Sequence, residues 1–181
     1  MRWEYQIVLA LFILMSLALG ARASETTDVV WIEGEDAQQR RVSHNGWYDS
    51  VKKEALSGGE WLTHFDEQRE GLVEYEFSVQ RRDEYDFWIR ANPIAARLSY
   101  QLDKENEWRS IDWGRDERGR MNIAQDNKPD LRFITWVKVG KVSLDAGKHT
   151  LSFRMHSGPQ NHGAIDCFVL TRIPFVPSGT T

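Results

Sequence analysis

The chain has 181 residues and a formal net charge of −4, with no stripe of basic residues to offset it. Such a surface repels a phosphate backbone, which excludes nucleic acid as a partner. Because Cys167 is the only cysteine, no internal disulfide can form, and stability has to come from a packed core.

The first residues have the features of an export signal. An apolar run covers Ile7 to Leu19, and Ala21-Arg22-Ala23 fits the A-x-A cleavage pattern. The run is shorter than the ~20 residues that span a bilayer. We therefore predict a signal peptide at 1–23, no membrane span after its cleavage, and a secreted, periplasmic or cell-surface location. A retained anchor is the alternative.

Beyond the leader, apolar and polar residues alternate with period two, and helical periodicity is almost absent. In GLVEYEFSVQ, for example, Val73, Tyr75 and Phe77 face one way and Glu74 and Glu76 the other. The pattern predicts about nine strands and an all-β, antiparallel β-sandwich over residues 24–173, followed by a linker-like tail at 174–181. The expected strands are WIEGEDA (31–37), EWLTHF (60–65), GLVEYEFSVQ (71–80), EYDFWIRAN (84–92), RLSYQLD (97–103), WRSIDW (108–113), FITWVKVGKVSL (133–144), HTLSFRM (149–155) and AIDCFVLT (164–171).

Two connections between these strands are long. Ser43 to Ser57 is polar but carries Trp47 and Tyr48, and Gly114 to Leu131 is highly charged. Loops of this length are commonly functional or mobile.

Acidic residues occur where strands should begin and end. In a strand, Glu33 and Glu35 would project from one face, since residues two apart share a face. Asp166 lies in an otherwise apolar strand, where a lone charge is costly unless it is neutralised. The three carboxylates would suit Ca²⁺, which prefers oxygen ligands. Alternatively, the two glutamates face solvent and Asp166 pairs with an arginine.

The order of these features resembles the family 6 and family 35 carbohydrate-binding modules. The resemblance is carried by EGED, SGGEWL, LVEYEFSV with EYDFWIRAN, the WVKVGKVSLDAGKHTL run and the closing AIDCFVL. It implies a non-catalytic β-jelly roll of the galactose-binding-like type. It also implies a structural calcium ion held by Glu33, Glu35 and Asp166.

The same resemblance places a sugar site in loops at one end of the sandwich, where aromatic rings stack on the sugar and polar groups bind its hydroxyls. The matching aromatic residues are Trp47, Tyr48 and Phe133. The chain departs from the family at Ala164, where an Asn often precedes the last strand, and Asn161 and His162 lie just upstream as substitutes.

Packing is the alternative role for all three aromatic residues of this site. Trp47 and Tyr48 would then cover the sandwich end, and Phe133 would lie in the core. Trp88 and Trp136 are assigned to packing, whereas Trp108 and Trp113 could form a platform on a sheet face.

No catalytic motif is found. There is no nucleophile elbow, no metal-ligating histidine spacing and no glycine-rich phosphate loop. We therefore predict an exported, non-catalytic module that binds polysaccharide or oligosaccharide, with a tethered or associated enzyme as a possible partner. The alternatives are an adhesion or structural sandwich that binds protein and has lost the sugar site, and a small polysaccharide-active enzyme that uses acids in the loop from Gly114 to Leu131. Loss of activity in Asp112→Ala or Asp116→Ala would favour the enzyme.

Overall fold

The structure is a computed structural model, and it describes residues 28–94, 96–156 and 163–179. The predicted signal peptide (1–23) lies outside these residues, as do Asn161 and His162 of the predicted sugar site.

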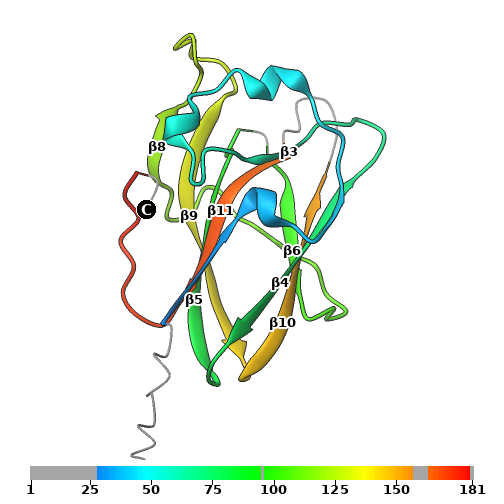
Figure 1. Ribbon diagram of the computed structural model, residues 1–181, viewed down its shortest axis with the longest axis vertical. Helices are drawn as coiled ribbons and strands as arrows, with labels where there is room; N and C mark the ends of the chain where they lie inside the picture. Colours follow the sequence, from blue (N-terminus) through cyan, green and yellow to red (C-terminus); the bar gives the residue numbers. More distant parts are fainter. Residues whose placement is uncertain (1–27, 95, 157–162, 180–181) are drawn as a thin grey trace, which may run out of the picture.

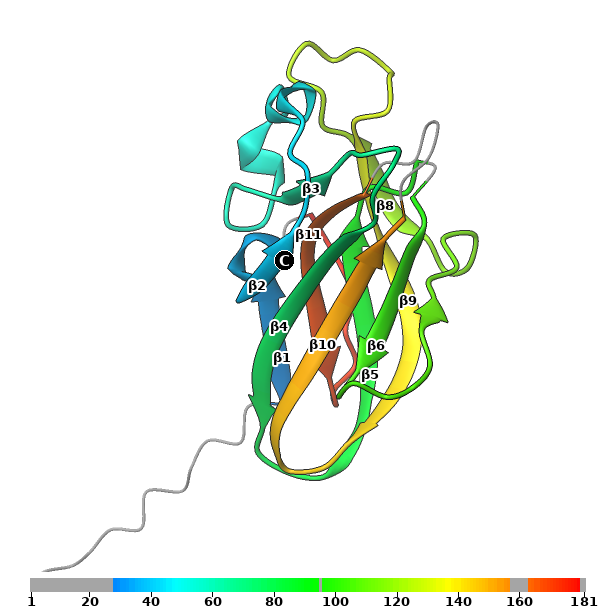
Figure 2. The same cartoon turned by 90° about the vertical axis from the view of Figure 1, so that its right-hand side faces the viewer.

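The described residues form two antiparallel sheets that pack face to face, which confirms the predicted all-β sandwich (Figures 1 and 2). The first sheet has the order β1-β11-β5-β9-β8, with β3 also paired to β11, and the second has the order β2-β4-β10-β6-β7. The strands of the first sheet are β1 (Val29–Glu33), β3 (Leu62–His64), β5 (Asp83–Ala91), β8 (Arg118–Asn122), β9 (Phe133–Leu144) and β11 (Gly163–Thr171). Those of the second are β2 (Gln39–Arg41), β4 (Gly71–Val79), β6 (Leu98–Leu102), β7 (Arg109–Ser110) and β10 (Gly147–Met155).

The core between the sheets is built by the alternating strands. In β4, the residues at every second position from Gly71 to Val79 are buried, and the glutamates between them lie on the outer side. All nine residues of β11 are buried, because this strand lies inside the sheet and is covered on both faces. Aromatic rings pack edge to face in the middle of this core, as do those of Tyr75 and Phe168, whose ring centres are 4.9 Å apart.

The structure adds elements that the alternation did not predict. The strands β2 and β8 carry mostly exposed polar residues, so they show no apolar period. Three short 3-10 helices also form: η1 (Gly34–Asp36), η2 (Gly46–Asp49) and η3 (Lys53–Ala55). The first corrects the assumed geometry of the acidic stretch, since β1 ends at Glu33 and Glu35 belongs to η1.

The described part of the tail packs on the outer face of the first sheet. Phe175 meets Trp31, Trp88 and Trp136 edge to face, with ring centres 6.3, 5.7 and 5.3 Å apart. The Trp136 indole N–H also donates to the carbonyl of Gly179. Residues 174–179 therefore lie against a layer of tryptophans on this sheet (Figure 1). Trp88 and Trp136 are buried, as predicted.

Within residues 28–94, 96–156 and 163–179, no helix has the length and apolar character needed to span a membrane.

Candidate ligand and metal sites

The two glutamates of the acidic stretch come together at the start of η1. Glu33 is half-buried, and its Oε1 accepts hydrogen bonds from the Trp31 indole at 2.9 Å and the Ser57 hydroxyl at 2.8 Å. Its other oxygen, Oε2, is buried without a hydrogen-bond partner, and so is Oε2 of Glu35. Two buried carboxylate oxygens without donors are groups that a cation would satisfy.

Gly58 leaves the space beside these carboxylates open. A methyl group on Gly58 would lie 2.7 Å from Glu35 Oε1 and 3.5 Å from the carboxyl carbon of Glu33. Its φ of +62° is also one that a side chain disfavours. Burial raises the pKa of Glu35, and the nearby negative charges of Glu33, Asp36 and Asp166 add to that rise. A divalent cation would offset the repulsion between these negative charges and favour the ionised carboxylates. Because Ca²⁺ prefers oxygen ligands, the site fits this ion.

Asp166, the third predicted ligand, is bound by other groups. Its Oδ2 accepts from the Arg90 guanidinium at 2.7 Å, and its Oδ1 accepts from the Ser57 backbone N–H at 2.9 Å. The described residues contain no group of three or more acidic, His or Cys side chains placed to hold a metal. Asp166 thus pairs with an arginine, as in the alternative left open above, and calcium ligation by Glu33, Glu35 and Asp166 together stays a prediction.

The Arg90–Asp166 pair is almost completely buried, at 1% and 0% side-chain exposure. The pairing of β11 with β5 shifts register between Ile165 and Cys167, so Asp166 occupies a bulge. Burial raises the pKa of Asp166 to about 6, although Arg90 acts in the opposite direction. The pair thus fixes the same loop that carries Gly58, since Arg90 also donates to the carbonyl of Ala55.

At the loop end of the sandwich, Trp47 is the exposed aromatic residue of the predicted sugar site. It lies in η2 and keeps 39% of its surface exposed. The Arg132 guanidinium stacks over its ring, 4.9 Å from the ring centre. Both residues line an open pocket of about 630 Å³, together with Ser50, Gln125 and Asp126. That size is in the ~300–1,000 Å³ range of small-ligand pockets.

Arg132, which the sequence did not single out, organises this pocket. Its side chain is 5% exposed and donates to Asp126, Asp130 and the carbonyl of Ser50, at 2.9, 3.0 and 2.7 Å. These contacts join the 45–50 loop to the 125–132 loop. Asp126 also binds Lys128 at 3.0 Å, so the charged groups of the pocket are paired with one another. We call this feature the Trp47 pocket.

The other described residues at the predicted sugar site are buried or half-buried. Tyr48 is 1% exposed and packs against Trp61, with ring centres 5.8 Å apart, so its faces are not available for stacking; this is the covering role left open above. Phe133 begins β9 and is half-buried. Ala164, at the position of the family's Asn, is fully buried. Asn161 and His162 lie outside the described residues.

The sheet-face and enzyme alternatives can be placed as well. Trp108 is half-buried under the Arg154 guanidinium, 4.2 Å from its ring centre, and Trp113 packs against the core. Asp112 and Asp116 are both exposed in the turn after β7, where Asp112 accepts a hydrogen bond from the Gly114 N–H.

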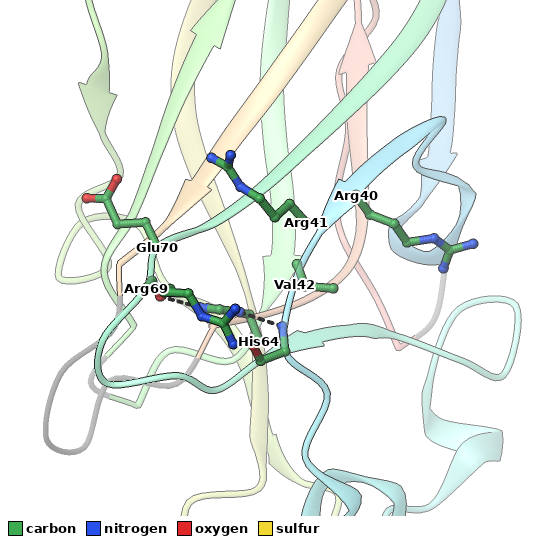
Figure 3. A pocket seen from close by; sticks show the side chains of 7 residues that line it. Arg40, Arg41, Val42, His64, Arg69 and Glu70 are labelled. Atoms are coloured by element: carbon green, nitrogen blue, oxygen red, sulfur yellow. Dashed lines mark hydrogen bonds between the residues drawn. The ribbon is translucent and has the colours of Figure 1, made fainter.

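A second pocket, of about 520 Å³, lies where β2 leaves the second sheet (Figure 3). Its floor is His64, whose Nδ1 accepts from the Ser43 N–H at 2.9 Å while its Nε2 contacts the carbonyl of Arg69 at 3.0 Å. The charged residues Arg40, Arg41, Arg69 and Glu70 also line the pocket. We call this feature the Arg41 pocket.

Comparison with solved structures shows the fold. The chain superposes on a family 35 carbohydrate-binding module from an environmental isolate with a TM-score of 0.52 and 12% identity, over 83% of this chain and 98% of the module. It also matches the GH26-CBM35 β-(1,4)-mannanase of Podospora anserina, with a TM-score of 0.52 and 22% identity, over 83% of this chain but only 29% of the mannanase. A family 6 module of Cellvibrio mixtus lichenase 5A, in complex with cellotriose, matches with a TM-score of 0.48 and 12% identity, over 80% of this chain and 98% of the module.

No protein-family model matches the sequence, and no curated protein matches it. At these identities the matches establish the fold alone. The chain has the β-sandwich fold of family 35 carbohydrate-binding modules, as the sequence motifs implied, and it spans about a third of the mannanase.

Proposed function

We propose that the protein binds polysaccharide or oligosaccharide without converting it, with the Trp47 pocket as the sugar site. The observation that carries the proposal is the indole of Trp47, which is exposed yet held in place by Arg132. A fixed, exposed aromatic face beside polar groups is what a pyranose ring needs, because its C–H patch stacks on the ring while its hydroxyls bind polar side chains.

A calcium ion at Glu33 and Glu35 has a structural role in this proposal. The unpaired oxygens of both residues and the open space at Gly58 support it. When bound, the ion would supply positive charge to the pair and fix η1 against the loop that contains Ser57.

The expected setting is outside the cell, in accordance with the predicted signal peptide. A single stacking ring gives modest affinity, and attachment to or association with an enzyme would raise the effective affinity by local concentration. The fold is joined to an enzyme in the GH26-CBM35 mannanase.

Affinity electrophoresis in gels that contain neutral soluble polysaccharides, such as galactomannan, xyloglucan and β-glucan, tests the proposal. We expect at least one polymer to retard the wild type. Trp47→Ala should weaken that retardation at least tenfold, which corresponds to ~1.4 kcal/mol, because the stacking face is lost. Val176→Ala, at a residue that is 76% exposed on the tail, is the control and should migrate as the wild type does.

The main competitor is a protein-binding sandwich that has lost its sugar site. Its support is that Tyr48 and Ala164 are buried, which leaves Trp47 as the one strongly exposed ring of the predicted set within the described residues. Retardation by none of the polymers would favour this competitor and refute carbohydrate binding.

A further inference from the structure

We propose that the Arg41 pocket is a second subsite, which binds an oxyanion, a carboxylate or a sulfate ester, on an acidic polysaccharide. This inference rests on the proposed function but concerns another part of the surface, between the end of β2 and the loop that follows β3 (Figure 3). The charges, their pairing and the rigidity of the pocket each support it.

The pocket contains a positive charge that the protein does not neutralise. Arg41 is exposed at the end of β2 and makes no ion pair with any residue that the structure describes. Arg40 also lines the pocket and has no ion pair among the described residues, but its head group extends away from that of Arg41 (Figure 3). The other charged groups are paired: Asp66 binds the Arg69 guanidinium at 2.8 Å, and Glu70 binds Arg154 at 3.4 Å. In a chain with a net charge of −4, an arginine left without a carboxylate is available for an anionic ligand.

Glu70, the acid that lines the pocket, is bound by other residues. Its carboxylate points away from His64 in Figure 3, and it contacts His156 Nδ1 at 2.8 Å in addition to Arg154. Arg154 thus balances the charge of Glu70, and no ion pair joins Glu70 to Arg41.

The walls of the pocket are held rigidly, which reduces the entropic cost of binding. Asp66 accepts hydrogen bonds from the Ser43 hydroxyl and from the backbone N–H groups of Gln68 and Arg69. These hydrogen bonds lower the pKa of Asp66 to about 2, so its carboxylate keeps the loop in place over the whole range of usual pH. His64 joins Ser43 to Arg69 beneath it.

Cross-strand register places the pocket beside the outer face of the second sheet. Arg41 pairs with Leu72, which in turn pairs with Arg154. Residues directly opposite one another share a face, so a glycan chain that reached Arg41 would lie along this row. A guanidinium offers the parallel N–H groups that suit the two oxygens of a carboxylate or sulfate.

Arg115 provides the control. It is exposed in the loop that follows β7, lies outside the Arg41 pocket, and makes no ion pair with any residue that the structure describes. Arg115→Gln and Arg41→Gln therefore remove the same charge from two separate parts of the surface.

The test compares binding to two pairs of polymers by affinity electrophoresis. The pairs are polygalacturonate with its fully methyl-esterified form, and a sulfated galactan with its desulfated form. We expect the wild type to bind at least one charged polymer more tightly than its neutral counterpart. Arg41→Gln should weaken that binding by about three- to tenfold and leave the neutral polymers unaffected, whereas Arg115→Gln should have little effect on either. Thermal unfolding of each variant checks that it is folded.

A preference for only one of the charged polymers identifies the oxyanion as carboxylate or sulfate. Equal wild-type binding to the charged and neutral members of both pairs overturns the subsite, and so do equal losses in the two arginine variants. Neither result affects the Trp47 pocket, whose failure is detected separately by neutral polysaccharides and Trp47→Ala.

Discussion

The Trp47 pocket and the Arg41 pocket are both lined by arginine, but the arginines differ in what they bind. Arg132 is buried, and its guanidinium contacts two carboxylates, a backbone carbonyl and the ring of Trp47. Arg41 is exposed and has no carboxylate partner among the described residues. The first arginine is therefore a structural element that presents an aromatic ring, whereas the second is available to a ligand.

The same distinction separates the three acids of the predicted metal site. Asp166 is buried and bound by Arg90, so it belongs to the framework. Glu33 and Glu35 each keep a buried oxygen without a donor, so they are suited to a cation. Pairing, rather than residue type, indicates which charged groups are available for binding.

The largest expected effect is at the buried pair. Arg90→Met leaves the carboxylate of Asp166 buried without its counterion, and the free energy of unfolding should fall by about 3–5 kcal/mol. Lys53→Met is the comparison, because Lys53 and Glu60 form an ion pair in which both side chains are more than half exposed. Its effect should be within about 1 kcal/mol. Urea denaturation measures both, and similar losses would contradict the structural role of Arg90.

The two pockets can be compared directly by the same substitution in each. Arg132→Gln removes charged hydrogen bonds to two aspartates and should lower the free energy of unfolding by about 2–3 kcal/mol. Arg41→Gln should change it by less than about 0.5 kcal/mol, since the side chain is exposed and unpaired. Equal destabilisation in chemical denaturation would show that Arg41 has a structural partner after all.

Calcium should stabilise the wild type through the glutamate pair. At a calcium concentration 100 times the dissociation constant, the gain in the free energy of unfolding is about 2.7 kcal/mol. Gly58→Ala places a methyl group against Glu35 and should abolish the gain. Gly119→Ala is matched to it, because Gly119 has a φ of +65° but no atom within 4 Å of the added methyl group, so the calcium response should persist.

Thermal unfolding with and without calcium measures the calcium-dependent stabilisation of both glycine variants. A calcium response that survives in Gly58→Ala, or that is absent from the wild type, would contradict the proposed metal site.

A smaller effect is expected from pH. The pKa of Glu35 is raised in the folded, metal-free protein, so this state binds more protons than the unfolded chain just above the ordinary pKa of a glutamate. The contribution of Glu35 to metal-free stability therefore decreases as the pH rises through this window. Calcium binds the ionised form, so the stabilisation by calcium should increase with pH over the same window.

Unfolding temperatures measured from pH 4 to pH 7, with calcium and with chelator, test this sign. A calcium effect that is constant with pH, or largest at the acidic end, would be inconsistent with binding at Glu35.

Much of the fold could be predicted because it depends on local alternation. The β4 and β10 strands show clear period-two patterns, and the continuous apolar run around Phe168 indicates a covered strand. The strand β8 could not be found in this way, since its RGRMN sequence is mostly exposed and forms by pairing with β9. The packing of Phe175 on three tryptophans likewise depends on contacts far apart in sequence.

The candidate sites depend even more on distant partners. The motif EGED located Glu33 and Glu35 near one another, but nothing near Asp166 in the sequence shows that Arg90 neutralises it. Similarly, the loop pattern located Trp47, whereas the support from Arg132 comes from 85 residues further along the chain. Tyr48 is adjacent to Trp47 and contacts its ring edge to face, with ring centres 4.9 Å apart, and yet is buried because it also packs against Trp61.

The central claim is that a sugar binds the exposed ring of Trp47 while the other tryptophans are part of the framework. The most direct measurement is a titration of the indole N–H signals of the ¹⁵N-labelled protein with an oligosaccharide of the polymer that retards it. The indole signal of Trp47, assigned by its absence from Trp47→Ala, should shift in a saturable manner, while those of the buried Trp88 and Trp136 remain unchanged. Saturable shifts confined to other indoles, with the Trp47 signal unmoved, would contradict the account.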